Sequence, residues 1–208
     1  MNKPTPIVLI FLLGLSCLLA ACASHQQTAT VAVETEVIKQ PPPQPARTDP
    51  WLLIDTKAET LTVMEGNRPM EVFNNIAVGS RGAGVKRTRG DEITPVGNFT
   101  IGWVNPTSRF NLFFGLDYPN KEYADTAYRE GRIDRYTYAR IVNALSQGQT
   151  PPQDTPLGGS IGIHGLGAGD PEIHSLFNWT TGCIALDNYQ IERLAHWVRI
   201  GTQVEIRG

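Results

Sequence analysis

The chain predicts a mainly β fold with a helical insertion and a C-terminal helix. Glycine (20 residues) and proline (15 residues) are frequent in the 208-residue chain, and both favour turns over long helices. Apolar and polar residues alternate through the first half of the folded region, which is typical of strands. Helical spacing of apolar residues is confined to the middle and the end of the chain.

Short strands are predicted where the alternation is bounded by turn residues. Gly66-Asn67 marks one turn, and the run from Pro95 to Asn98 marks another directly before a strand. The expected strands are 52–54, 61–63, 72–73, 76–78, 99–103, 160–164 and 204–206.

Two helices are predicted in the middle of the chain, where they form the helical insertion. Apolar residues indicate a helix over 138–145, with Asp134 as its N-cap and Gly148 beyond its end. A second helix is expected just before it, over 122–130, and ends at Gly131.

A further helix is predicted near the C-terminus. Asp187 is followed by Gln190 at the spacing of a capping box, and Gly201 is the expected end. The apolar face of this helix comprises Ile191, Leu194, Ala195 and Val198.

Residues 1–21 have the pattern of a signal peptide. Lys3 precedes an apolar run over 7–21, which is shorter than the roughly 20 residues of a membrane span. The sequence Leu19-Ala20-Ala21-Cys22 resembles the lipobox of bacterial lipoproteins. That resemblance implies a lipidated Cys22, whose acyl chains anchor the protein to a membrane. The alternatives are a membrane anchor and an ordinary signal peptide, which would leave Cys22 as a stray thiol.

Residues 22–50 are predicted to be a lipid-anchored, proline-rich linker, and residues 51–208 the folded domain. The linker is polar and contains Pro41-Pro42-Pro43-Gln44-Pro45, which is typical of an extended spacer. Ala23 rather than an aspartate follows the lipobox cysteine, which resembles the pattern of lipoproteins sorted to the outer membrane. We therefore expect a lipid-anchored protein of the cell envelope that faces the periplasm.

Charge and cysteine content narrow the class of function. The formal net charge is −2, so the chain lacks the basic field of a nucleic-acid binder. Once Cys17 leaves with the signal and Cys22 is lipidated, Cys183 is the only free thiol of the mature chain. Such a cysteine is either buried and inert or reactive, depending on its surroundings.

The surroundings of Cys183 predict an acyl-transfer site. His164 stands at the end of a predicted strand, and an imidazole is a common activator of a thiol nucleophile. Gly182 allows a sharp turn at the cysteine, and amides in such a turn can face a developing oxyanion. Thr180 and Thr181 are expected to pin the turn through bonds from side chain to backbone.

These stretches resemble the signature of the L,D-transpeptidase catalytic domain, also called the YkuD domain. The matching residues are His164-Gly165 and Thr180-Thr181-Gly182-Cys183-Ile184. Residues 90–101 (GDEITPVGNFTI) also resemble the family's Gly-x-x-x-Thr-Pro-x-Gly turn, and residues 51–79 its opening hairpins. Residues 116–120 (LDYPN) resemble a stretch of one branch. The resemblance covers most of the folded domain.

The resemblance implies a β-sandwich-like domain that acts on peptidoglycan stem peptides. A thiolate attacks the bond between the third stem residue and D-alanine, and an amine resolves the thioester. Carried over, Cys183 is the nucleophile and His164 the base. The Gly165 carbonyl would orient the imidazole, and the amides of Gly182 and Cys183 would line the oxyanion hole. No cofactor and no metal are implied.

Two positions depart from the family pattern. Thr181 stands where many members have a second histidine, and Ala185 where many have an arginine that helps to hold the substrate. The branch with Gly-Cys-x-Ala includes hydrolases, some of which release lipoproteins from peptidoglycan. The leading function is nevertheless an L,D-transpeptidase of cell-wall biogenesis and cell shape, because transfer is the commoner activity in the family that the chain resembles. The alternatives are a hydrolase (an L,D-carboxypeptidase, or an amidase releasing a wall-linked lipoprotein) and a non-catalytic wall-binding lipoprotein.

Substrate contacts are expected from Thr180 and Thr181 and from the basic run Lys86, Arg87 and Arg89. Such a run is usually a solvated face. By family analogy it lies near the substrate, where Arg87 and Arg89 would bind peptidoglycan carboxylates.

The remaining histidines are given ordinary roles. His174 is expected on the surface, and His196 in packing or on the surface. A zinc site built from His164, His174 and Cys183 would lack recognisable ligand spacing.

Overall fold

The computed structural model describes residues 49–208, which form an eight-stranded mixed sheet. The strand order is β3-β2-β1-β10-β6-β7-β8-β9. The strands are β1 (Trp51–Asp55), β2 (Thr60–Glu65), β3 (Arg68–Asn74), β6 (Gly97–Ser108), β7 (Asn111–Leu116), β8 (Gly162–His164), β9 (Ile184–Ala185) and β10 (Gln203–Arg207). A second small sheet pairs β4 (Ala83–Gly84) with β5 (Thr94–Pro95).

Four short helices accompany the sheet. They are α1 (Lys121–Arg129), α2 (Arg135–Ser146), α3 (Pro171–Leu176) and α4 (Asn188–Leu194). The prediction of a mainly β fold with a helical insertion and a C-terminal helix is confirmed. None of the helices within residues 49–208 has the length and apolar character needed to cross a membrane. The predicted signal peptide, the lipidated Cys22 and nearly all of the linker lie outside the described residues.

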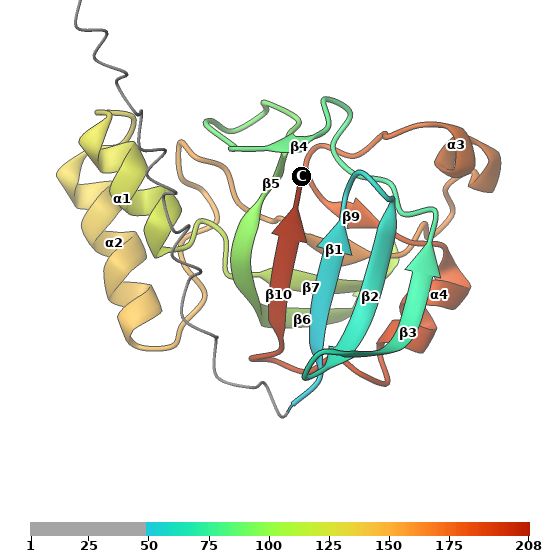
Figure 1. Ribbon diagram of the computed structural model, residues 1–208. Helices are drawn as coiled ribbons and strands as arrows, with labels where there is room; N and C mark the ends of the chain where they lie inside the picture. The colour runs from blue at the N-terminus through green and yellow to red at the C-terminus, as the bar shows by residue number, and fades with distance from the viewer. Residues whose placement is uncertain (1–48) are drawn as a thin grey trace, which may run out of the picture. The chain divides into compact units, whose positions relative to one another are not determined.

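The long strand β6 folds the sheet over itself. Residues 97–100 of β6 pair with β10, whereas residues 101–108 pair with β7 through two register shifts. A bulge of this kind bends a strand and increases its twist. As a result, β7 and the second part of β6 cross behind the upright strands β10 and β1 (Figure 1). The two layers are sandwich-like, as predicted.

The main core lies between these layers and holds the strands of the site. Leu52 of β1 and Val204 of β10 are register partners, and both are buried. Ile163 of β8 and Ile184 of β9 are also register partners, and they belong to the same apolar cluster. Burying one such side chain contributes about 1.5–3 kcal/mol. The short strands that carry the site are therefore anchored by their apolar faces.

The helical insertion has its own small core. Asp134 caps α2 by accepting a hydrogen bond from the backbone N–H of Thr137 (2.7 Å), which confirms the predicted N-cap. Asn120 caps α1 in the same way through Tyr123 (3.0 Å). The buried residues of this second cluster are Ala124, Ala127, Ile133, Ile141 and Leu157.

The C-terminal helix is shorter than its apolar pattern predicts. The capping box of Asp187 and Gln190 is present, but α4 ends at Leu194 and not near Gly201. The N–H of Ala195 still bonds four residues back, to Ile191, but those of His196 and Trp197 bond only three residues back, so the chain turns. Ala195 still packs against the core, as do residues 197 and 198. The helical spacing of these residues therefore reflects burial without a helix.

Two predicted strands are also reduced in the structure. The strand expected over 160–164 is present only as Gly162–His164. The strand expected over 76–78 is an isolated bridge between Ala77 and Ala185. Ladder pairing stops at these points, although the flanking apolar residues remain buried.

Candidate active site

The parallel pairing of β8 and β9 brings the segments that carry His164 and Cys183 side by side. His164 lies opposite Ala185 in this ladder. Cys183 directly precedes β9, two residues before Ala185. The imidazole and the thiol are therefore carried by neighbouring segments of the sheet.

His164 is buried and has a defined tautomer. Its Nδ1 lies 2.7 Å from the carbonyl oxygen of Gly165, which can only accept a hydrogen bond. Nδ1 therefore carries the proton, and the lone pair of Nε2 is free to accept one. Burial lowers the pKa of His164, although the Gly165 carbonyl opposes this effect. The imidazole is thus neutral near pH 7, the form that a general base requires.

Aromatic rings fix the plane of the imidazole. Phe110 stacks on His164 at 4.3 Å between ring centres, and Phe113 at 5.8 Å. Trp179 meets the imidazole edge-on at 5.9 Å. The guanidinium of the exposed Arg109 lies 4.7 Å from the ring centre of Phe110, and its positive charge also lowers the pKa of His164.

The turn that carries the cysteine is closed by Thr180. Its hydroxyl donates to the carbonyl of Cys183 (2.7 Å) and accepts from the backbone N–H of Gly182 (3.1 Å). Gly182 has a φ of +130°, a conformation that glycine adopts readily. The predicted pinning role thus lies on Thr180, since Thr181 is exposed and its hydroxyl makes no hydrogen bond within residues 49–208. The N–H of Gly182, expected in the oxyanion hole, is engaged by this hydroxyl.

Strand β5 and the residue before it, Ile93, support the turn from behind. Thr94 accepts a hydrogen bond from the N–H of Gly79 (2.8 Å) and donates to the carbonyl of Cys183 (3.4 Å). A Cβ atom at Gly182 would lie only 2.9 Å from the carbonyl oxygen of Ile93. Glycine is therefore required at 182 by close backbone approach as well as by its dihedral angle.

The thiol of Cys183 is enclosed and protonated. It donates to the carbonyl of Ser160 over 3.4 Å. Burial raises its pKa to about 11, while the N–H of Gly162 and the charge of Lys86 act in the opposite direction. Within residues 49–208 no hydrogen bond joins this thiol to His164.

One member of the basic run is not solvated. Lys86 is buried, with 2% of its side chain exposed, and it pairs with Asp91, whereas Arg87 and Arg89 are exposed. Arg87 is exposed and bonds to Glu130 (3.2 Å). Arg89 donates to the carbonyl of Thr155 from two nitrogens, at 3.2 and 3.1 Å.

His174 and α3 were not anticipated beside the site. His174 was expected on the surface, but it is buried, and its Nδ1 accepts a hydrogen bond from the indole of Trp179 (3.3 Å). Asp170 caps α3, and Pro171 stands at the start of the helix. This pattern of an N-cap followed by proline was the available sequence signal. His196 was expected either in packing or on the surface, and it is exposed.

Among residues 49–208, no cluster of three or more His, Cys, Asp or Glu side chains could hold a metal ion.

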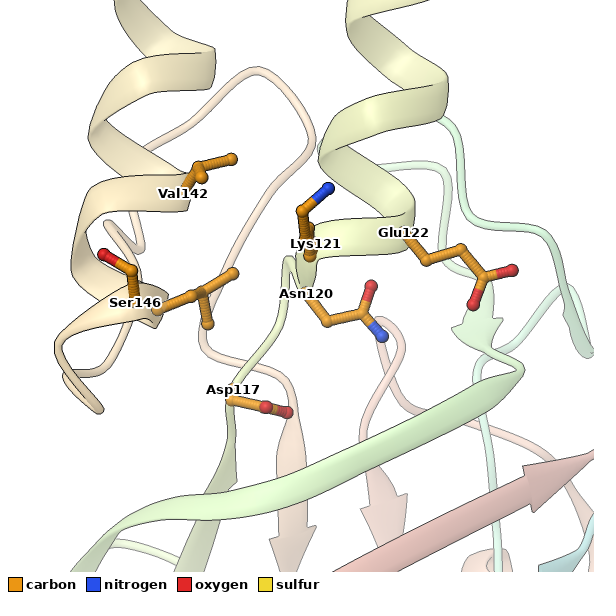
Figure 2. A pocket seen from close by; sticks show the side chains of 7 residues that line it. Asp117, Asn120, Lys121, Glu122, Val142 and Ser146 are labelled. Carbon is orange, nitrogen blue, oxygen red and sulfur yellow. The ribbon is translucent and has the colours of Figure 1, made fainter.

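A cavity of about 480 Å³ lies between α1, α2 and the sheet, apart from His164 and Cys183. Asp117, Lys121 and Val142 are among the side chains that line it (Figure 2). Two of its charged groups already have partners: Asp117 accepts from Thr100 (2.8 and 3.0 Å), and Lys121 bonds to Asp125 (2.7 Å).

The fold and the site define a class of protein: a mainly β domain with a buried histidine and a Gly-Cys turn on adjacent strands. The model of the YkuD L,D-transpeptidase catalytic domain matches residues 49–206. The chain belongs to this family.

The chain is similar to several solved structures. The helical cell shape determining protein Pgp2 from Campylobacter jejuni is 25% identical with a TM-score of 0.51, over 76% of this chain and 47% of that chain. A mutant of the same protein is 24% identical with a TM-score of 0.52, over 77% and 47%. An Enterococcus faecium L,D-transpeptidase mutant is 11% identical with a TM-score of 0.43, over 77% and 50%. The chain spans about half the length of these structures. Among curated proteins, none matches the chain.

Proposed function

We propose that this protein is a cysteine-dependent L,D-transpeptidase that acts on peptidoglycan stem peptides. The observation that carries the proposal is the free Nε2 of the buried His164, whose strand pairs with the strand that directly follows Cys183. Membership of the L,D-transpeptidase family supplies the substrate class. A wall-binding lipoprotein without activity would have no use for this pair or for the constrained Gly182 turn.

The first step forms a thioester. The thiol turns about its Cα–Cβ bond from the Ser160 carbonyl towards His164, and Nε2 takes its proton. The sulfur then attacks the carbonyl carbon of the third stem residue, and negative charge moves to the carbonyl oxygen. The N–H of Cys183 donates to this oxyanion, and the N–H of Gly182 joins it when the hydroxyl of Thr180 releases it. The bond to D-alanine breaks, and its amine takes the proton from His164.

The second step resolves the thioester. An amine from a second stem peptide attacks the thioester carbon while His164 accepts its proton. The new amide bond forms, and the sulfur leaves and is reprotonated by the imidazolium. Arg87, Arg89, Thr180 and Thr181 are the proposed substrate-binding residues, with the two arginines directed at stem carboxylates.

Hydrolysis is the second candidate, because one residue differs from the usual pattern. Ala185 stands where many members have an arginine, and it is fully buried. No cation at this position can hold a second stem in place for transfer. Water would then resolve the thioester, and either a stem peptide or a wall-linked lipoprotein would be the substrate.

We also propose that the protein is lipid-anchored at Cys22 in the outer membrane and faces the periplasm. The support is the Leu19-Ala20-Ala21-Cys22 sequence followed by Ala23. We expect Cys22→Ser to move the protein from the membrane fraction to the soluble fraction. Wild-type protein that fractionates as soluble would contradict the anchor.

Incubation with purified muropeptides tests the activity. We expect wild-type protein to release D-alanine from tetrapeptide stems and to give a product identified by mass spectrometry. Cys183→Ala should give no product, with a melting temperature close to that of the wild type, because the change removes only the small thiol. A fully active alanine variant would reject the proposal.

A further inference from the structure

Lys86 is a buried lysine behind the proposed nucleophile. Its side chain is 2% exposed, and its ammonium pairs with Asp91, which is 13% exposed. Lysine is almost never fully buried unless it is paired. With so little exposure, the ammonium cannot contact a substrate. It can act only on groups inside the domain.

Asp91 uses the rest of its carboxylate to close the loop that carries Lys86. One oxygen accepts the backbone N–H groups of Arg87 (2.8 Å) and Thr88 (3.1 Å), and the other accepts that of Ile93 (3.3 Å). Burial acts to raise the pKa of Asp91, but Lys86 and these N–H groups hold it below its usual range. The lysine is thus held by a carboxylate that is itself fixed to the backbone.

The same loop touches both walls of the thiol site. On one side, Ile93 backs onto Gly182, and Thr94 bonds to the carbonyl of Cys183. On the other side, a Cβ at Gly158 would lie 3.4 Å from Cε of Lys86. Two residues after Gly158, the carbonyl of Ser160 accepts a hydrogen bond from the thiol of Cys183. The segment that carries the ion pair therefore contacts both the turn that carries the sulfur and the segment whose carbonyl holds it.

We propose that Lys86 and Asp91 form a positioning pair that holds a fixed positive charge behind Cys183 and stabilises its thiolate. The loop between β4 and β5 also carries Asp91, which pairs with Lys86, and Glu92, which accepts from the hydroxyl of Ser80 (2.6 Å), while β8 carries His164. Lys86 is the cation that opposes the effect of burial on the thiol. A cation near a cysteine is a recognised means of favouring its thiolate.

The pair is tested by the reactivity of the thiol and not by turnover. In the full chain, alkylation of Cys183 by iodoacetamide is followed between pH 6 and pH 11 by mass spectrometry of the peptide that contains it. The variant is K86M/D91N, which removes both charges together and leaves an amide oxygen to accept the loop N–H groups. Neutralising both members avoids an unpaired buried charge, the main reason why single changes destabilise such pairs.

We expect alkylation at pH 7 to slow about tenfold, which corresponds to a rise of about one unit in the pKa of the thiol. The control is K121M/D125N, which removes an exposed Lys–Asp pair on α1 and should leave the profile unchanged. If the methionine variant does not fold, K86Q/D91N provides the same comparison. A folded variant with the wild-type profile, or an equal change in the control, would overturn the proposal.

The inference rests on the proposed function only in taking Cys183 as the nucleophile. Alkylation uses no stem peptide, so its profile reports the influence of Lys86 even if muropeptides are not substrates. Retained turnover in Cys183→Ala would end the proposed function, whereas an unchanged alkylation profile would end only the role of the ion pair.

Discussion

Nδ1 of His164 lies 2.7 Å from the carbonyl oxygen of Gly165, the next residue in the chain. Because the carbonyl can only accept, this contact leaves Nε2 as the one imidazole nitrogen able to take a proton from a thiol. A Cβ at Gly165 would lie 2.8 Å from atoms of Asn188 and Ile191. The glycine therefore lets the carbonyl approach the histidine while α4 packs against the same backbone.

His164→Ala should abolish turnover and slow alkylation of Cys183 near neutral pH, because the thiol loses its base. In the wild type, burial lowers the pKa of His164 below its ordinary value of 6.5. The imidazole is thus neutral above that value, and activity is lost as the pH falls through the lowered pKa. A rate profile against pH should show its acidic limb below pH 6.5. His196→Ala, a change at an exposed histidine, is the control and should behave as the wild type does. An acidic limb that persists in His164→Ala would identify another base.

Thr180→Val should lower both stability and activity, because valine has the shape of threonine without its hydroxyl. The N–H of Gly182 loses its partner, and the carbonyl of Cys183 keeps only the longer bond from Thr94. An unsatisfied buried group costs about 1–3 kcal/mol. Chemical denaturation and a muropeptide assay measure the two effects.

Thr181→Val is the matched control for that change, since Thr181 is exposed. Its free energy of unfolding should remain within about 0.5 kcal/mol of the wild type. Equal losses in both variants would show that neither hydroxyl closes the turn.

Gly182→Ala should destabilise the protein and remove activity. The methyl group would meet the carbonyl of Ile93 at 2.9 Å, and the backbone at a φ of +130° would be strained. Strain of this kind costs about 1–3 kcal/mol. Gly201→Ala shares the positive φ (+90°), but its methyl group would meet nothing within 4 Å. It should lose some stability and keep its activity. Activity retained in Gly182→Ala would mean that the turn tolerates movement of the cysteine.

Asp91 should contribute stability that depends on pH. Its pKa lies below the ordinary value of 3.8, so the unfolded chain binds a proton more readily than the folded chain. The contribution is therefore complete above pH 3.8 and is lost as the pH falls through the lowered pKa. The difference in unfolding free energy between wild type and Asp91→Asn should shrink between pH 6 and pH 3. Asp125→Asn removes a more exposed carboxylate and should show a smaller change. A constant difference for Asp91→Asn would contradict the linkage.

Local sequence signals predicted part of this molecule. The caps at Asp134 and Asp187 act within three residues, so the pattern alone identified both helix starts. His164 and Cys183 were found through motifs, and the pairing of β8 with β9 brings their segments side by side. The overextended C-terminal helix shows the limit of periodicity, because residues beyond Leu194 are apolar for packing.

The burial of Lys86 could not be read from its neighbours in the sequence. Beside Arg87 and Arg89 it has the pattern of a solvated run, yet its environment combines Asp91 in the same loop with Gly158 from a distant segment. His174 of α3 is likewise buried, and its ring accepts a hydrogen bond from the indole of Trp179. Both depend on tertiary contacts between segments that are far apart in the chain.

The cations that hold the substrate affect the choice between transfer and hydrolysis. Lys86 is buried, so only Arg87 and Arg89 of the basic run remain for this role. Replacing both arginines by alanine should raise KM about tenfold, equal to about 1.4 kcal/mol of binding. Arg207→Ala removes an exposed cation from the end of β10 and is the control.

Ala185→Arg should not restore substrate binding, because the side chain at 185 is fully buried and an unpaired buried charge is strongly destabilising. If the double arginine variant keeps its KM, Arg109 beside Phe110 becomes the cation to replace.

With wild-type protein, mass spectrometry of the muropeptide products should show cross-linked dimers in excess over hydrolysed monomers. That result would exclude the hydrolase as the main activity. An excess of hydrolysed monomers would instead mean that water resolves the thioester, as the loss of a cation at 185 would favour.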